Sequence, residues 1–234
     1  MSKYKRVMLK LSGEALSGNK GHGFDEATVI MVGNQVKKMV EQGIEVGIVI
    51  GGGNFWRGRS NENMDRCKAD EIGMMATVMN CLYASEIFRT LGIKSSVMTP
   101  FGVGAMTEEF SRDTALEKIK NQEVVFFAGG TGHPYFSTDT AVALRALQIE
   151  AEVILLAKNI DGVYDSDPKK NPEARKYDRI SIEEVIQKGL QVVDLTAAIM
   201  CQENNMPMLV FYLGDNDSII NAVNDKISGT FVYI

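Results

Sequence analysis

The sequence is short of several residue types, and each shortage narrows what the protein can do. It holds three cysteines, Cys67, Cys81 and Cys201, and no two of them form a C-x-x-C pair. An odd number of widely spaced cysteines argues against a disulfide framework and against a zinc site. We therefore expect a protein of the reducing cytoplasm, in which each cysteine is a small buried hydrophobic residue rather than a nucleophile.

Long apolar runs and an excess of positive charge are also missing. The apolar residues that follow Lys3, Lys5 and Arg6 are interrupted by Lys10, so this segment is too short for the core of a signal peptide. No segment approaches the ~20 apolar residues of a membrane span. The net charge of −5 disfavours binding of polyanions over a broad surface, so we expect neither nucleic acid nor membrane as a partner.

The familiar nucleotide-binding motifs are absent as well. The chain has no Gly-Lys dipeptide and hence no Walker A loop, and Trp56 stands where the fingerprint beginning at Gly51 and Gly53 needs its third glycine. The His-Arg-Asp and Asp-Phe-Gly motifs of protein kinases are missing. The only histidines, His22 and His133, are far apart, and we interpret His133 as a loop residue that binds rather than catalyses.

The apolar periodicity predicts strands alternating with helices along almost the whole chain. We expect strands over 6–11, 46–50, 95–98, 124–128, 153–156, 209–212 and 231–234, and helices over 25–40, 64–91, 112–121, 139–147, 181–188, 194–204 and 218–223. This alternation is typical of an α/β fold with a mainly parallel sheet. No linker, repeat or low-complexity tract interrupts it, so we expect a single domain over 1–234.

Two further segments have a clear pattern. The expected helix over 64–91 carries an apolar stripe, which we interpret as core because methionine fills irregular gaps. The stripe consists of Met74, Met75, Val78, Met79 and Leu82. The segment 159–172 contains Asp-Gly, Asp-Pro and Asn-Pro pairs, which predict an extended loop.

Glycine-bearing turns follow three of the expected strands, at 10–13, 51–53 and 129–132. Ligands of an open parallel sheet bind beyond the carboxyl ends of its strands, and free backbone N–H groups attract anions. Three such ends on one edge predict an extended anionic ligand, or two ligands that meet there. Three unrelated tight turns are the alternative.

Charged residues near these ends are suited to phosphoryl transfer, which depends on positioning and charge neutralisation. The candidates are Lys10, Arg57, Lys158, Asp70, Asp139, Asp161 and Asp167. Lys10 interrupts an apolar strand, which is costly unless its ammonium leaves the strand end or meets an anion. Asp139 stands at an expected helix N-terminus, where it is either a cap or a group that organises lysines or a metal. Arg57 is either a phosphate-binding fork or a surface residue after a turn.

Five segments together resemble the bacterial uridylate (UMP) kinases of the amino-acid kinase superfamily. They are KLSGEAL at 10–16, GGGN-x-x-RG at 51–58, GMMATVMN at 73–80, GTG-x-PYFSTD at 130–139 and DGVY-x-x-DP at 161–168. The resemblance covers essentially the full chain, with the motifs in the same order. It implies a three-layer α/β/α sandwich, assembled as a homohexamer, that transfers a phosphoryl group from Mg-ATP to UMP in pyrimidine nucleotide biosynthesis.

The resemblance also implies roles for individual residues. ATP would be bound by Lys10, Leu11, Ser12, Gly13, Gly53, Arg57, Lys158, Asn159, Tyr164 and Asp167. UMP would be bound by Gly52, Asp70, Thr131, Gly132, His133, Pro134, Tyr135, Phe136, Ser137 and Thr138, with Asp70 accepting from the ribose hydroxyls. Lys10, Arg57 and Asp139 would be catalytic. The Mg²⁺ ion would be held mainly by nucleotide phosphates, and Asp194 matches a family aspartate without an assigned contact.

Regulation is implied by the same resemblance, with GTP as activator and UTP as inhibitor. The GTP response would involve the loop of Gly18, Asn19, Lys20, Gly21, His22 and Gly23. Two alternatives stay open. Another superfamily member would phosphorylate a carboxylate or carbamate and would need neither Asp70 nor the loop at 131–138. A pyrimidine-nucleotide sensor would bind without catalysis and would need neither Lys10 nor Asp139.

Overall fold

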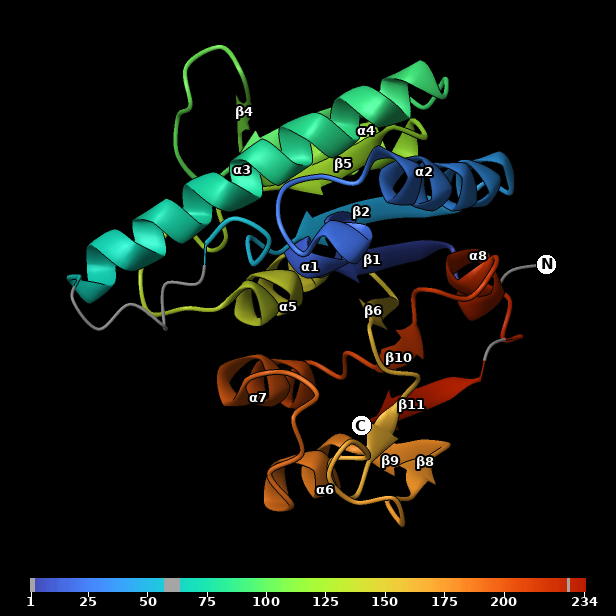
Figure 1. The fold of residues 1–234 in the computed structure, drawn as a ribbon. Coiled ribbons are helices and arrows are strands. Elements are labelled where there is room, and N and C mark those ends of the chain that lie inside the picture. The colour runs from blue at the N-terminus through green and yellow to red at the C-terminus, as the bar shows by residue number, and fades with distance from the viewer. Residues whose placement is uncertain (1–2, 57–63, 227) are drawn as a thin grey trace.

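The computed structural model describes residues 3–56, 64–226 and 228–234, and Arg57 with the following Gly58 therefore lies outside the described residues. Its main feature is a nine-stranded sheet in the order β4-β3-β5-β2-β1-β6-β10-β11-β9 (Figure 1). The strands are β1 (Arg6–Leu11), β2 (Glu45–Ile50), β3 (Ser95–Thr99), β4 (Glu108–Glu109), β5 (Val124–Phe127), β6 (Val153–Lys158), β9 (Arg179–Ser181), β10 (Met208–Tyr212) and β11 (Gly229–Tyr233). Of the pairings in this sheet, β10 with β11 is antiparallel and the others are parallel, which confirms the expected mainly parallel sheet.

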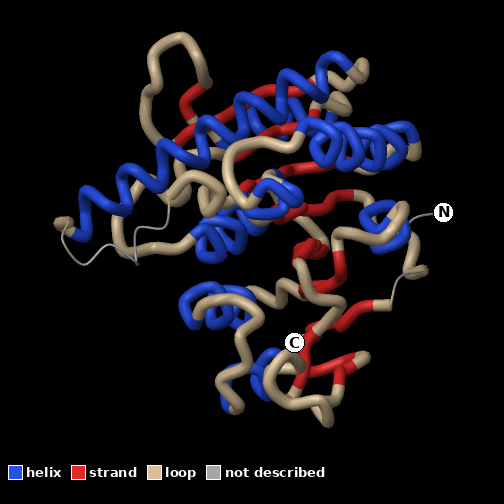
Figure 2. The backbone as a smooth tube through the Cα atoms, in the orientation of Figure 1, coloured by secondary structure: helices blue, strands red, loops and turns tan. Residues whose placement is uncertain are grey.

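Helices cover both faces of the sheet and make three layers, as Figure 2 shows in blue and red. In chain order they are α1 (Gly13–Leu16), α2 (Glu26–Glu41), α3 (Arg66–Thr90), α4 (Arg112–Lys120), α5 (Thr138–Gln148), α6 (Ile182–Gln187), α7 (Leu195–Glu203) and α8 (Ser218–Val223), with a 3-10 turn, η1, at Gly18–Lys20. Two clusters of buried apolar side chains lie between the sheet and the helices, one on each face. One contains side chains of α2, α3 and α8, and the other contains side chains of α4 to α7.

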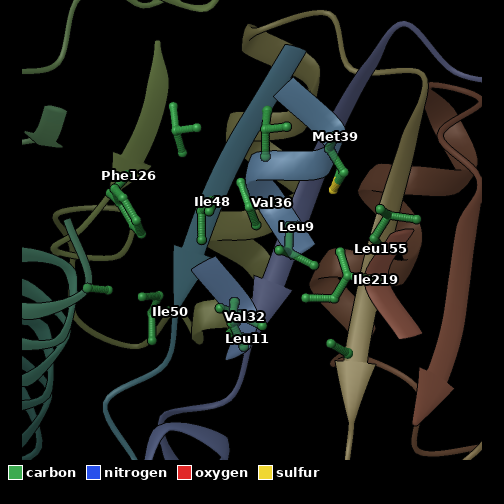
Figure 3. Close-up of a cluster of buried hydrophobic side chains, with 14 of the residues drawn as sticks. Leu9, Leu11, Val32, Val36, Met39, Ile48, Ile50, Phe126, Leu155 and Ile219 are labelled. Carbon is green, nitrogen blue, oxygen red and sulfur yellow. The ribbon is translucent and has the colours of Figure 1, made fainter. Parts of the chain in front are cut away.

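The alternation of side chains along β1 explains this division. Leu9 and Leu11 point into the cluster under α2, whereas Met8 belongs to the cluster on the opposite face. Figure 3 shows the first cluster, in which Leu9 lies among Val36 and Met39 of α2 and strand residues such as Ile48. Because β1 is apolar on both faces, it lies in the centre of the sheet, between β2 and β6.

Several details differ from the sequence-based predictions. The turn after β1 continues as the short helix α1, and the loop predicted over 159–172 contains β7 (Val163–Tyr164), which pairs with β8 (Lys176–Tyr177). Short elements of this kind lack the several periods that a sequence pattern needs to be recognised.

The interpretation of the methionine stripe of α3 as core is wrong for Met75 and Met79, which are 43% and 46% exposed. Met74, Val78 and Cys81 recur every three or four residues on the face that packs on the sheet. Met75 and Met79 each lie one residue further on, so they are rotated by about 100° away from that face. The cysteine prediction is confirmed for Cys81 and Cys201, which are buried, whereas Cys67 is only half-buried.

Candidate active site

The carboxyl ends of four neighbouring parallel strands, β5, β2, β1 and β6, form the candidate site. Leu11 at the end of β1 lies opposite Ile50 of β2 on one side and Ala157 of β6 on the other. The three predicted glycine-bearing ends follow β1, β2 and β5, and Lys158 ends β6. The fold therefore brings together the segments that the sequence singled out.

The turns after β1 and β2 are packed directly against each other. The N–H of Gly51 donates to the carbonyl of Leu11 at 3.0 Å, and Ser12 caps α1 by accepting from the N–H of Ala15 at 3.1 Å. A Cβ atom added to Gly13 would lie 2.5 Å from both the Gly51 carbonyl oxygen and Asn54 Oδ1. Only glycine fits at position 13, because this contact leaves no room for a side chain.

A lysine and an aspartate form the charged centre of the site. Lys10 Nζ lies 3.0 Å from Asp139 Oδ1, and the two side chains are 13% and 22% exposed. Lys10 thus meets the anion that its place in an apolar strand requires. A largely buried lysine that a carboxylate holds in place can neutralise charge on a transferred phosphoryl group.

Lys158 belongs to this centre. Its ammonium donates to the carbonyl of Val192, and burial lowers its pKa, an effect that Asp139 opposes and Lys10 reinforces. Its position beside both groups goes beyond the role in nucleotide binding that the family resemblance implied. The end of β6 therefore supplies a second cation whose charge interacts with that of Asp139.

The start of α5 sets the position of Asp139. Ser137 is the N-cap, and its hydroxyl accepts from the N–H groups of Asp139 and Thr140 at 3.0 and 3.3 Å. The same hydroxyl donates to the carboxylate of Asp194, which also accepts from the Thr140 hydroxyl at 3.0 Å. Ser137 therefore makes the cap, and the alternative reading of Asp139 as the cap is wrong.

A cavity of about 200 Å³ lies beside this centre, between α3 and the turns after β2 and β5. Its lining consists of Gly52, Gly53, Trp56, Arg66, Ala69, Asp70, Gly73, Met74, Thr77, Gly130, Thr131, Phe136, Ser137 and Thr138. Most residues predicted to bind the acceptor nucleotide are in this set. Among the described residues, Gly132, His133, Pro134 and Tyr135 lie outside the lining, although the N–H of Tyr135 donates to Asp70 Oδ2 at 2.8 Å.

Residues predicted to hold the nucleoside of the donor are distributed beyond β6. Asn159 is exposed, and the hydroxyl of Tyr164 donates to Asp161 Oδ1 at 2.8 Å, a bond that raises the pKa of Tyr164. Asp167 is also exposed and accepts from the N–H of Lys169 at 3.0 Å. The side chains of Tyr164 and Asp167 engage local partners, and the stacking of Tyr164 on a base stays a prediction.

The loop at 18–23 is attached to the turn after β2. The amide of Asn54 donates to the Gly23 carbonyl at 2.9 Å, and the N–H of Gly23 donates to the Asn54 carbonyl at 3.3 Å. The ring of His22 packs edge-on against Phe55 with centroids 5.3 Å apart. The loop therefore contacts the residues that directly follow the triglycine turn, Gly51 to Gly53.

Two polar residues on the buried face of α3, Thr77 and Asn80, were not predicted from the sequence. Thr77 accepts from the N–H of Gly129 at 2.8 Å, and Asn80 donates to the Gly51 carbonyl at 2.7 Å. A signal was present, because a threonine and an asparagine three residues apart interrupt an otherwise apolar helix face. Together they connect α3 to the turns after β2 and β5.

In the parts of the chain that the structure describes, no group of three or more His, Cys, Asp or Glu side chains is arranged to hold a metal ion. Nor does any helix within these parts have the length and apolar character needed to cross a membrane.

Comparison with known proteins places the chain in a family. The model of the amino acid kinase family matches residues 5–212. The UMP kinase from Bacillus anthracis is 34% identical with a TM-score of 0.94, over 98% of this chain and 96% of that one. The UMP kinase from Ureaplasma parvum is 36% identical with a TM-score of 0.94, over 99% and 100% of the two chains.

A more distant structure shares the same fold. The uridylate kinase from Archaeoglobus fulgidus is 26% identical with a TM-score of 0.73, over 99% of this chain and 100% of that one. The family match and the two closely superposing enzymes show that this chain is a phosphotransferase that belongs to the amino acid kinase family and groups with its UMP kinases.

Proposed function

We propose that the chain transfers the γ-phosphoryl group of ATP to UMP, giving ADP and UDP for pyrimidine nucleotide biosynthesis. The observation that carries the proposal is the Lys10–Asp139 pair at 3.0 Å, placed beside a cavity that Asp70 lines. The similarity to two UMP kinases at 34% and 36% identity supports the choice of acceptor.

At the ATP site, backbone N–H groups and lysine side chains would bind the phosphates in place of a Walker A loop. Residues 10–13 would hold the ATP phosphates, with Gly53 facing them from the neighbouring turn. Lys10 and Lys158 would neutralise charge that develops on the transferred group, and Asp139 would hold both ammonium groups in place. Arg57, which lies outside the described residues, completes the predicted set.

On the acceptor side, the cavity would take the sugar and base of UMP. Asp70 would accept from the ribose hydroxyls, and 131–138 would enclose the uracil. Gly52 would face UMP, and a Cβ there would lie only 3.0 Å from the carbonyl oxygen of Gly73, which leaves little room for a side chain at this position. The phosphoryl group would then pass between the two nucleotides above Gly52 and Gly53.

The oxygen ligands available at the site fit a Mg²⁺ ion that is carried by the nucleotide. Mg²⁺ binds through one or two carboxylates and substrate phosphates rather than through a protein cage, and Asp139 is the carboxylate placed at the charged centre. The ion would screen the phosphate charge. Asp139 and Lys10 orient the reacting groups, and the buried position of Lys158 helps to exclude water.

Assembly and regulation form a further part of the proposal. We expect a single-domain subunit in a cytoplasmic homohexamer, activated by GTP through the loop at 18–23 and inhibited by UTP. The two hydrogen bonds between Gly23 and Asn54 support a connection from that loop to the triglycine turn. Size measurement by light scattering, with GTP and UTP titrations of the rate, tests this part.

A coupled ADP-release assay tests the reaction itself. The acceptors are UMP, CMP, aspartate, acetylglutamate and carbamate, each with Mg-ATP. We expect turnover with UMP and the largest kcat/KM for it. Turnover with aspartate, acetylglutamate or carbamate but not with UMP would contradict the proposal, and binding of UMP without any turnover would indicate a sensor.

A further inference from the structure

Arg66, in the first turn of α3, has no role in the function proposed above. We infer that Arg66 is a positioning residue for the acceptor: it fixes the carboxylate of Asp70 so that one oxygen is held and the other is presented to the ribose. This inference rests on the proposed use of Asp70 by UMP.

The two oxygens of Asp70 are in different surroundings. Oδ2 accepts from Arg66 Nε and from the N–H of Tyr135, both at 2.8 Å. Within the described residues, no group donates to Oδ1. Asp70 lines the cavity and its side chain is 14% exposed, so Oδ1 is available to a donor that enters the cavity. A ribose hydroxyl is such a donor.

Arg66 also supplies the charge that this arrangement needs. An unpaired carboxylate in the acceptor cavity would repel the phosphate of an incoming nucleotide. The guanidinium lines the same cavity as Asp70 and pairs with it, so the wall presents little net charge to the ligand. The planar guanidinium donates through Nε to Oδ2 at 2.8 Å, a directional contact that a flexible ammonium makes less well.

The Arg66–Asp70 pair also contacts the loop over 130–138. Tyr135 has a φ of +72°, a left-handed conformation that is unfavourable for a residue with a side chain. Its N–H is held by Asp70, and the guanidinium of Arg66 lies 5.3 Å from the centre of its ring. Arg66, Asp70 and Tyr135 thus join α3 to the loop predicted to enclose the base.

The test compares two acceptors that differ by one hydroxyl, UMP and 2′-deoxy-UMP, in steady-state assays of the full chain. For Arg66→Ala we expect the KM for UMP to rise about tenfold with kcat within about twofold, because a hydrogen bond to a charged group is lost. The rise should be smaller for 2′-deoxy-UMP. Arg66→Lys should restore part of the loss. Lys68→Ala, which removes an exposed partner of Glu71 on the same turn, is the control and should change neither constant.

The outcomes are distinct. Equal losses for UMP and 2′-deoxy-UMP, or a loss in kcat alone, would overturn the role of Arg66 while wild-type turnover of UMP upholds the proposed function. Absence of UMP turnover by the wild-type protein would overturn the proposed function and this inference with it. Thermal unfolding of Arg66→Ala close to that of Lys68→Ala shows that the comparison is made on folded protein.

Discussion

Asn54 and Asn80 donate side-chain hydrogen bonds to each other's amide oxygens, at 2.9 and 2.8 Å, and neither residue is more than 1% exposed. Each amide has a further acceptor, the Gly23 carbonyl for Asn54 and the Gly51 carbonyl for Asn80. This buried pair therefore joins α3, the triglycine turn and the loop over 18–23. Because buried polar groups are costly when left unpaired, the pair strongly favours one arrangement of the three segments.

Replacement of Asn80 by alanine tests that relationship. The variant leaves the Asn54 amide and the Gly51 carbonyl short of partners and opens a small cavity, so we expect a loss of about 3 kcal/mol in the free energy of unfolding. Urea unfolding followed by circular dichroism measures it. Asn204→Ala is the control, because Asn204 is exposed and its amide donates to the Met200 carbonyl of its own helix. Equal midpoints for the two variants would show that the pair is not stabilising.

The Lys10–Asp139 pair should matter for turnover more than for folding. We expect Lys10→Ala and Asp139→Asn each to lower kcat by about 10² to 10⁴, the range found when a charge-stabilising group is removed from an active site. Stopped assays at saturating ATP and UMP measure the change. Lys38→Ala, which breaks the exposed ion pair with Asp217 on the surface, should leave kcat unchanged. Near-normal rates for both Lys10 and Asp139 variants would show that the reaction centre lies elsewhere.

The central elements could be predicted from the sequence because their signals are long and consistent. The strand over 6–11 was expected with the bounds that the structure has, and α2 was expected from its regular valines and methionine. The glycine turns and Lys10 were also identified in advance, because glycine and lysine are unusual at the ends of apolar strands. Their meeting at one edge followed from the parallel sheet.

The interior-facing polar side chains could not be placed in the same way. Sequence periodicity shows which face of α3 is apolar, but the partners of Thr77 and Asn80 lie more than 20 residues away along the chain. Likewise Lys158 was expected as a nucleotide contact and as a charged candidate for phosphoryl transfer, but its place relative to Asp139 depends on how β6 lies against β1. Long-range contacts of this kind are fixed by packing rather than by local pattern.

The buried ammonium of Lys158 predicts a dependence of stability on pH. Burial lowers the pKa of Lys158 in the folded state. Below this folded-state pKa, the charged ammonium costs free energy of folding. The cost disappears as the pH rises from the folded-state pKa toward the pKa of about 10.5 in the unfolded chain. We therefore expect the stability of the wild type relative to Lys158→Met to increase between pH 7 and 10. Urea unfolding of both proteins across this range measures it.

The control for this series is Lys120→Met, which alters an exposed lysine at the end of α4. The difference in stability between the wild type and Lys120→Met should not show the increase between pH 7 and 10 that is expected for the wild type relative to Lys158→Met. At pH 7 we expect Lys158→Met to lower kcat about a hundredfold without loss of stability, since active-site groups often trade stability for activity. A constant stability difference between wild type and Lys158→Met at all pH values would contradict the assignment of a buried, charged Lys158.

Variants of two serine N-caps, Ser137 and Ser181, distinguish the effect of the start of α5 on stability from its effect on turnover. Ser137 caps α5 next to Asp139, and Ser181 caps α6 by accepting from the N–H of Glu184 at 3.1 Å. Loss of either cap should cost about 1 kcal/mol of unfolding free energy. Ser137→Ala also removes the donor to Asp194 and frees the first turn that carries Asp139, so we expect kcat to fall about tenfold because misplacement of a reacting group is costly. Ser181→Ala should keep the wild-type kcat, and an equal fall in kcat for both variants would mean that the effect comes from lost stability alone.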